Sequence, residues 1–295
     1  MTASAAVPID ISADERPAEG LIDRLRADER TLVIAVSGDR IPVSDGSFAF
    51  TAPDRIGDAC WAFLGRSPSG SGVLLAALAD RDAEAPAGTW AAFRDAAAGM
   101  TADEVQLGMS AVALGRWLAG APFCPACGTQ TEQRMGGWAR WCPVCSSEHF
   151  PRTDPAVIVA VTSADRQRLL LGANAMWQGR MFSCFAGFVE AGESAESAIH
   201  RELFEEAGVS VRDVRYVASQ AWPYPRSLML GFEATAVDED AVRPDGEEII
   251  ETRWFTRDEI RRGLAGELEV RIPGGISVAH QLIRAWCDEA EAPAS

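Results

Sequence analysis

The sequence of 295 residues predicts an α+β protein with a small N-terminal domain, a zinc ribbon and a larger C-terminal α/β domain. Two Cys-x2-Cys pairs lie in a segment rich in Pro, Gly and Trp, and β-branched runs alternate with helical patterns after it. The length, at about 150 residues per domain, also favours two domains. The predicted parts are a disordered tail at 1–20, an α+β domain at 21–120, the ribbon at 121–150 and the α/β domain at 151–295.

The N-terminal parts show no pattern that points to chemistry. Residues 1–20 are small, polar and rich in Pro and Ala, which is typical of disorder. The elements predicted in 21–120 are strands at Thr31–Val36 and Gly72–Leu78 and helices at Thr89–Gly99 and Ala102–Ala119. We therefore expect residues 21–120 to form a packing or dimerisation domain.

Strand and helix patterns alternate in residues 151–295, which is typical of an α/β domain. The predicted strands are Ala156–Val161, Leu169–Leu171, Val214–Gln220, Ser227–Val237 and Trp254–Phe255. The predicted helices are one that follows Ser194 and runs to Ala207, a short one at Arg257–Leu264 and a C-terminal one at Ser277–Glu289.

The charge balance excludes several classes of partner. There are 43 acidic residues against 27 basic residues, all of them Arg, and the net charge is −16. A protein that binds duplex DNA tightly, or a basic helix that lies on a membrane surface, would carry a cluster of basic residues, which this acidic sequence lacks. No apolar run approaches the ~20 residues that a transmembrane helix needs. The first 20 residues lack the features of a signal peptide. We therefore expect a cytoplasmic protein whose cysteines are reduced or metal-bound.

Four of the seven cysteines form two Cys-x2-Cys pairs, Cys124/Cys127 and Cys142/Cys145, with 14 residues between the pairs. Four thiolates at this spacing can surround one Zn²⁺ and leave no position open for water, so we predict a structural zinc ribbon rather than a catalytic zinc. The alternative is two unrelated pairs. Because only two cations, Arg134 and Arg140, lie inside the ribbon, nucleic-acid binding by it is disfavoured.

The other cysteines and the histidines stand alone in the sequence. We expect the three lone cysteines to be small buried apolar residues. We expect the three histidines to be surface or core residues rather than catalytic ones. The residues concerned are Cys60, Cys184 and Cys287, and His149, His200 and His280.

Three glutamates are spaced to share one face of a helix that Ser194 caps and Gly208 ends. Glu202, Glu205 and Glu206 stand at positions i, i+3 and i+4, where like charges repel unless a divalent cation binds them. By itself this spacing also fits a solvated acidic face, so the glutamates alone leave both interpretations open.

The surrounding residues resemble the signature of the Nudix hydrolases: Gly, five residues, Glu, seven residues, Arg-Glu, an apolar residue, any residue, Glu-Glu, any residue, Gly and an apolar residue. The matching positions are Gly187, Glu193, Arg201, Glu202, Leu203, Glu205, Glu206, Gly208 and Val209. The resemblance implies a Nudix α/β/α sandwich with a mixed sheet. It also implies hydrolysis of a nucleoside diphosphate linked to another moiety.

The same resemblance assigns roles within the signature. Glu202, Glu205 and Glu206 would be catalytic and would bind Mg²⁺ or Mn²⁺, which neutralises the pyrophosphate and polarises the attacking water. Glu193 and Arg201 would form a structural pair. The general base would be a glutamate or a metal-bound hydroxide, and the sequence does not decide between them.

A stiff loop with two prolines and two aromatic residues follows the signature and suits either a nucleotide or an ordinary hydrophobic corner. It resembles the SQPWPFPxS motif of the NADH pyrophosphatases, with Ala221 in place of Pro and Tyr224 in place of Phe. The substrate-binding residues that this resemblance implies are Ser219, Gln220, Ala221, Trp222, Pro223, Tyr224, Pro225, Arg226 and Ser227.

The resemblance to NADH pyrophosphatases covers about 21–290 and implies further site residues. Phe150 and Phe188 would stack on a base. Glu248 would be a fourth metal-binding carboxylate, with Glu247 and Glu251 as neighbouring alternatives. The carbonyl of Ala186 would complete the metal shell. The backbone of Ala279 would contact substrate. A substrate-contacting Glu that some members carry in the ribbon is replaced here by Gly136-Gly137.

The resemblance to these families implies two functions, and a third is weighed beside them. The first is a homodimeric enzyme that cleaves NADH or NAD⁺ to AMP and nicotinamide mononucleotide. The second uses the same chemistry to remove the NAD cap from RNA 5′ ends, and the third is a sensor that binds a nucleotide without cleaving it. The intact set of signature glutamates disfavours the sensor. The sequence leaves open the preferred substrate and the choice between Mg²⁺ and Mn²⁺.

Overall fold

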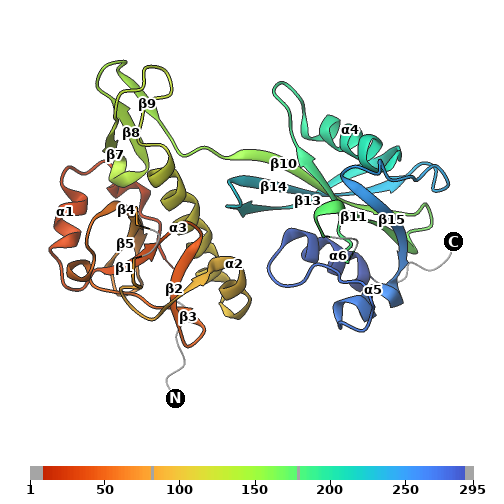
Figure 1. Ribbon diagram of the computed structural model, residues 1–295, viewed down its shortest axis with the longest axis horizontal. Helices are drawn as coiled ribbons and strands as arrows, with labels where there is room; N and C mark the ends of the chain where they lie inside the picture. Colours follow the sequence, from red (N-terminus) through yellow and green to blue (C-terminus); the bar gives the residue numbers. More distant parts are fainter. Residues whose placement is uncertain (1–8, 81–82, 178–179, 290–295) are drawn as a thin grey trace. The chain divides into compact units, whose positions relative to one another are not determined.

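The computed structural model describes residues 9–80, 83–177 and 180–289. The chain forms two compact units, residues 1–152 and residues 153–295 (Figure 1). The ribbon segment belongs to the first unit, and the division falls two residues after the predicted end of the ribbon.

The first unit contains a three-stranded sheet in the order β1-β5-β4, with β1 parallel to β5 and β4 antiparallel to it. The long helix α3 contacts all three strands. A capping box of Thr101 and Glu104 starts this helix. The bounds are β1 Leu32–Val36, β4 Ala59–Arg66, β5 Gly72–Leu78 and α3 Ala102–Gly120.

A second small sheet, in the order β3-β2-β6, corrects one prediction. The helix expected over Thr89–Gly99 is wrong in its first part, because β6 pairs with β2 along its whole length. The remainder forms one turn of α2 and a 3-10 turn, so tertiary pairing overrides the helical propensity of the alanines. The bounds are β2 Arg40–Ser44, β3 Ser47–Phe48, β6 Thr89–Ala92 and α2 Phe93–Ala96.

Residues 9–20 are ordered, in contrast to the disorder expected for 1–20. Asp10 forms a β-bridge with Arg66, and the same Arg66 pairs with Glu15 at 2.5 Å between Nη2 and Oε2. A 3-10 turn at Ala13–Glu15 and helix α1, Leu21–Arg26, complete this segment. Amino-acid composition does not predict the order of this segment, because two backbone hydrogen bonds and one ion pair hold it in place. Residues 1–8 lie outside the described part of the chain.

The ribbon is a three-stranded sheet in the order β7-β8-β9, and the 3-10 turn Met135–Gly137 between its first two strands contacts β4. The indole Nε1 of Trp138 donates to the Phe63 carbonyl at 2.7 Å. Gly137 has a φ of 90°, and a Cβ there would lie 2.5 Å from the Cβ of Ala62, so the Gly136-Gly137 pair permits this contact. The bounds are β7 Glu132–Arg134, β8 Ala139–Cys142 and β9 Ser147–His149.

The second unit is a six-stranded mixed sheet between two helical layers, which confirms the predicted sandwich. The order is β13-β14-β10-β11-β15, with β12 paired to β10 and only β10 and β14 parallel. α4 covers one face, and α5 and α6 cover the other (Figure 1). The strands are β10 Asp154–Thr162, β11 Arg168–Asn174, β12 Phe185–Phe188, β13 Val211–Trp222, β14 Ser227–Ala236 and β15 Ile249–Thr256, and the helices are α4 Ala195–Ala207, α5 Arg257–Leu264 and α6 Val278–Asp288.

Candidate active site and zinc centre

Helix α4 begins and ends where the sequence predicts. The hydroxyl of Ser194 accepts the amide N–H of Ser197 at 3.1 Å, and Gly208 ends the helix with a φ of 63°. The apolar side of the helix, which includes Ile199 and Leu203, is buried against the sheet. The glutamates of the helix therefore lie beside β12.

Gly187 of β12 lets the helix approach the sheet closely. A Cβ at this position would lie 2.0 Å from both Cδ and Oε1 of Glu202. The backbone of Gly187 pairs with Val157 in ordinary register, and its φ is not positive. Space for the carboxylate, rather than backbone freedom, therefore explains this glycine.

Arg201 holds the loop between β12 and α4, as predicted for the structural pair. Its Nε and Nη2 donate to the two carboxylate oxygens of Glu193 at 3.0 and 2.9 Å, and Nη2 also donates to the Phe188 carbonyl at 2.9 Å. The bidentate bond lowers the pKa of Glu193. Arg201 Nη1 contacts Glu202 and Glu205 at 2.8 and 3.2 Å.

Four glutamates line one cavity of 380 Å³: Glu202 and Glu206 of α4, Glu248, and Glu190 of the loop after β12. Glu206 is 5% exposed, and its Oε2 has no hydrogen-bond partner among the residues that the structure describes. Burial raises the pKa of Glu206 to about 8, and the negative charges of Glu248 and Glu202 add to the effect. Burial also raises the pKa of Glu202.

This donor set fits a divalent cation. Carboxylates are the ligands that Mg²⁺ and Mn²⁺ prefer, and a cation among them would give the buried Glu206 oxygen a partner and relieve the repulsion. Ala186, which the sequence assigns to the metal shell, lines the same cavity. Glu205 does not line it: its side chain is 59% exposed and pairs with Arg201.

Glu248 is brought to α4 by the loop that precedes β15. The carboxylate of Asp245 accepts the amide N–H of Glu248 at 3.1 Å and that of Ile249 at 2.8 Å. The Asp245 amide in turn donates to the Glu206 carbonyl at 3.1 Å, and Asn174 donates to Glu248 Oε1 at 3.3 Å. Of the three glutamates that the sequence left as alternatives, Glu248 is the one that lines the cavity.

The proline-rich loop divides between the cavity and the scaffold. Trp222, Tyr224 and Ser227 line the cavity, and the two aromatic rings meet edge to face at 5.2 Å. Gln220 instead ties β13 to α6: its amide donates to the Ile276 carbonyl and accepts the Val278 N–H at 2.7 Å. The loop residues outside the cavity lining are Ser219, Gln220, Ala221, Pro223, Pro225 and Arg226, the last of which pairs with Asp154.

The remaining predicted substrate residues have different surroundings. Phe188 is 53% exposed and lines the cavity, whereas Ala279 is buried in the core between α6 and the sheet. Phe150 belongs to the first unit, where it is exposed. The sequence missed Ala156, Glu190 and Met229, which also line the cavity. The strand alternation that follows Ser227 could have indicated Met229.

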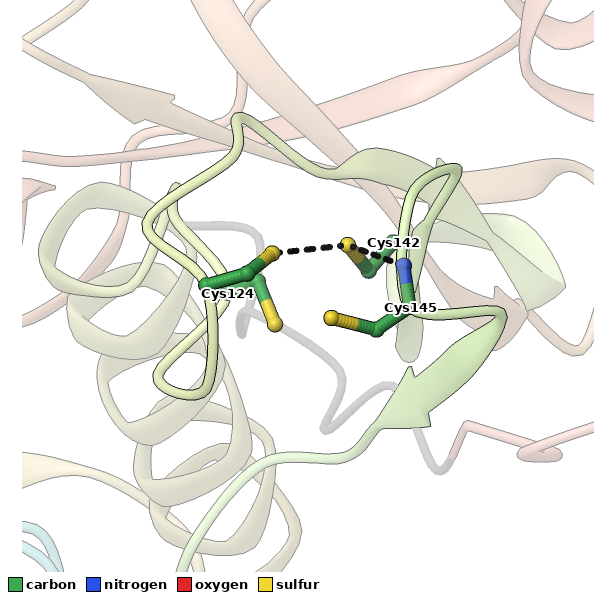
Figure 2. A group of neighbouring side chains, drawn as sticks. Cys124, Cys142 and Cys145 are labelled. Carbon is green, nitrogen blue, oxygen red and sulfur yellow. Dashed lines mark hydrogen bonds between the residues drawn. The ribbon is translucent and has the colours of Figure 1, made fainter.

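The four predicted zinc ligands lie together: one ligand atom from each of Cys124, Cys127, Cys142 and Cys145 falls within 4.8 Å of the others. Three of these side chains converge in Figure 2. Each cysteine pair is followed by a residue with a left-handed backbone, Gly128 or Ser146. The N–H of that residue donates to the carbonyl of the first cysteine of its pair, Cys124 or Cys142, at 2.9 Å. The hydroxyl and N–H of Thr129 lower the pKa of Cys127 to about 6, which favours a metal-binding thiolate.

The ribbon should depend on this metal for its structure. We expect one Zn²⁺ per chain by elemental analysis, and we expect Cys142→Ser, or prolonged chelation, to unfold the ribbon and lower the melting temperature of the first unit. Val144→Ser, which changes an exposed side chain in the same knuckle, is the control and should leave both quantities unchanged. A Cys142→Ser chain with full zinc content and unchanged melting would contradict the four-cysteine centre.

Comparison with known proteins places the chain in a class. Residues 152–272 match the NUDIX domain, and residues 121–150 match the NADH pyrophosphatase zinc ribbon domain. The NAD-capped RNA hydrolase NudC of Mycobacterium tuberculosis is 41% identical over 275 residues, which are 89% of this chain and 85% of that protein. This chain therefore belongs to the Nudix hydrolase family.

Two further proteins are similar to parts of the chain. The NAD-capped RNA hydrolase NUDT12 of Homo sapiens is 41% identical over 180 residues, or 58% of this chain and 39% of the human protein. The crystal structure of a NUDIX hydrolase from Nitrosomonas europaea covers 57% of this chain and 90% of its own, with 26% identity and a TM-score of 0.43. Among the described residues, no helix is long and apolar enough to cross a membrane.

Proposed function

We propose that the protein is a pyrophosphatase that hydrolyses NADH and NAD⁺ to AMP and nicotinamide mononucleotide. The observation that carries the proposal is one cavity whose lining includes the carboxylates of Glu202, Glu206 and Glu248 together with the aromatic rings of Trp222 and Tyr224. Carboxylates suit the metal that a pyrophosphate needs, and flat rings suit a base. The NADH pyrophosphatase ribbon match and the NudC relative support the same substrate class.

The chain's own residues would divide the work as follows. Glu202, Glu206 and Glu248 would hold Mg²⁺ or Mn²⁺, and Ala186 would complete the shell through its carbonyl. The bound ion would supply positive charge to the pyrophosphate and lower the pKa of a bound water. Arg201 would keep the loop after β12 in place, so that the exposed ring of Phe188 stays beside the cavity.

The similarity to two NAD-capped RNA hydrolases favours a second substrate, the NAD cap of an RNA 5′ end, cleaved at the same bond. The net charge of −16 opposes long-range attraction of RNA but permits a single-stranded end to enter a cavity. The salt dependence of the cleavage rate distinguishes the two substrates. Cleavage of an RNA should depend steeply on salt because the protein contacts phosphates along the chain, whereas a free dinucleotide offers few phosphate contacts.

The proposal is tested by product analysis. The purified protein with Mg²⁺ or Mn²⁺ receives NADH, NAD⁺, ADP-ribose and an NAD-capped RNA in parallel. We expect AMP and reduced nicotinamide mononucleotide, formed fastest from NADH. Faster cleavage of capped RNA with little from NADH would move the function to decapping, and tight nucleotide binding without cleavage would make the protein a sensor.

Three further features belong to this proposal. A homodimer is expected, and light scattering of the zinc-loaded protein measures it directly. The activity should require Mg²⁺ or Mn²⁺, and titration of each ion identifies the preferred one. The cytoplasm is the proposed location, since a four-thiolate zinc centre is maintained under reducing conditions.

A further inference from the structure

The first unit contains a cavity of 740 Å³ between residues 16–26 and residues 133–137 of the ribbon. Its lining includes no residue of the zinc centre or of the carboxylate cavity. Three arginines line it: Arg16 from the N-terminal segment, Arg26 at the end of α1 and Arg134 at the end of β7. A cavity of this size is large enough for a small ligand.

Contacts within the first unit hold the two walls of this cavity together. The side-chain amide of Gln133 donates to the Trp61 carbonyl of β4 at 3.4 Å. Gly136 has a φ of 55°, and a Cβ at this position would lie 3.6 Å from both Cα and the carbonyl oxygen of Arg16, so the turn of the ribbon packs directly on the N-terminal segment. Helix α1 in turn contacts β4 and β5. The cavity is therefore part of the folded unit before any ligand enters it.

Each of the three guanidiniums that line the cavity lies over the ring of a tryptophan. The distances from Cζ to the ring centroid are 3.8 Å for Arg16 over Trp138, 4.7 Å for Arg26 over Trp61 and 4.5 Å for Arg134 over Trp141. Stacking on an aromatic face restrains the plane of a guanidinium and presents its N–H edges to an anion. Because the guanidiniums cover these ring faces, the cavity favours an anion over a stacked base.

The positive charges in this cavity are poorly compensated. Within the described residues, neither Arg16 nor Arg26 forms an ion pair with a carboxylate or donates a side-chain hydrogen bond. The Nε of Arg16 is buried without a hydrogen-bond partner there, and burial lowers the pKa of this guanidinium. Arg134 lies 3.8 Å from Glu132, and both of these side chains are exposed. A partly buried cation without a counter-charge is unfavourable, and an anion bound in the cavity would relieve this cost.

We propose that this cavity is a binding site for a compact phosphate-bearing anion, whose oxygens accept hydrogen bonds from Arg16, Arg26 and Arg134. Guanidinium edges match phosphate oxygens, and a phosphate group has enough acceptors for three arginines, whereas a carboxylate has two oxygens. Glu19 and Asp23 also line the cavity, and both are exposed, so water screens their charges. These carboxylates and the net charge of −16 favour a small anion over a long polyanion. The site does not depend on the proposed activity, because its lining belongs entirely to the first unit.

The test is calorimetric titration of the zinc-loaded, full-length protein with inorganic pyrophosphate. Mg²⁺ and Mn²⁺ are left out, so that the glutamates of the other cavity repel the probe. We expect binding, and we expect Arg16→Met and Arg26→Met each to raise the Kd at least about tenfold. Asp23→Asn should lower the Kd, because it removes a negative charge from the lining. Damage to the fold would not produce that gain in affinity.

Arg55→Met is the matched control, because it removes an exposed arginine of the same unit that does not line the cavity, and it should leave the Kd unchanged. Zinc content and circular dichroism report whether each variant folds, and Arg26 is exposed, so its variant provides the test even where Arg16→Met does not fold.

Two results would overturn the proposal directly: no pyrophosphate binding by the wild-type protein, or the same Kd in Arg26→Met as in the wild type. An uncapped single-stranded RNA oligomer is the second probe. Tighter binding of this RNA than of pyrophosphate, weakened by the same arginine substitutions, would overturn the assignment to a small anion and make the cavity a contact for an RNA backbone.

Discussion

Glu206→Gln is expected to lower turnover by about 10²–10³-fold at saturating Mg²⁺ or Mn²⁺, with the fold unchanged. Glu206 is the most buried of the glutamates that line the cavity, and its Oε2 lacks a partner within the described residues. An amide has the same shape but no charge to hold a cation. Steady-state kinetics with NADH measure the loss, and calorimetric Mn²⁺ binding shows whether it comes from the metal site.

The same substitution is expected to stabilise the metal-free protein above about pH 7. The pKa of Glu206 is raised from 4.5 to about 8 in the folded chain, chiefly by burial. Between these two values the unfolded chain loses its proton while the folded chain keeps it, so the free energy of unfolding falls as pH rises. Gln removes this penalty, and the melting temperature at pH 8 should rise by a few degrees, about 1 kcal/mol or more.

Two substitutions on the same helix serve as comparisons. Glu196→Gln changes an exposed first-turn residue and should alter neither activity nor stability. Glu205→Gln removes a carboxylate that pairs with Arg201 outside the cavity, so its loss of turnover should be smaller than that of Glu206→Gln. Near-wild-type turnover in Glu206→Gln would contradict the proposed metal site. A larger loss of turnover in Glu205→Gln than in Glu206→Gln would indicate that the metal binds on the exposed side of α4.

Motifs whose chemistry fixes residue identity could be predicted from the sequence. The cysteine pairs and the signature glutamates must stand at fixed spacing, and the caps at Ser194 and Gly208 mark the ends of α4. The spacing could not separate Glu205 from Glu206, because both lie on one side of the helix. Only packing against the sheet buries Glu206 and leaves Glu205 in solvent.

Tertiary contacts account for the predictions that failed or stayed open. The sequence does not rank the two cations of the ribbon, yet Arg140 is buried, where it contacts the Leu118 carbonyl and the Trp117 ring of α3. The substrate role of Gln220 stays a prediction, and the sequence did not indicate that both ends of its side-chain amide bond to Ile276 and Val278 at the start of α6. Glu248 could not be separated from its neighbours by sequence, because the turn made by Asp245 selects it.

Gly187→Ala is expected to abolish most metal binding while leaving the protein folded. The new Cβ would lie 2.0 Å from the Glu202 carboxylate, which is the far end of a flexible side chain and can swing away. The backbone at Gly187 is ordinary extended strand, so alanine adds no conformational strain. The stability change should therefore stay within about 1 kcal/mol. The displaced carboxylate should weaken Mn²⁺ binding and lower turnover by about tenfold or more.

The melting temperature and the Mn²⁺ affinity together distinguish a displaced Glu202 side chain from a general loss of stability. Gly274→Ala is the control, since nothing lies within 4 Å of its added Cβ and its φ is not positive. A Gly187→Ala protein with a wild-type melting temperature and weak Mn²⁺ binding would show that the glycine is required for the position of Glu202. Unchanged Mn²⁺ affinity would mean that Glu202 holds the ion from another rotamer or does not bind it. In that case Glu206 and Glu248 would remain among the cavity carboxylates available to the metal, because the three atoms nearest to an added Cβ at 187 all belong to Glu202.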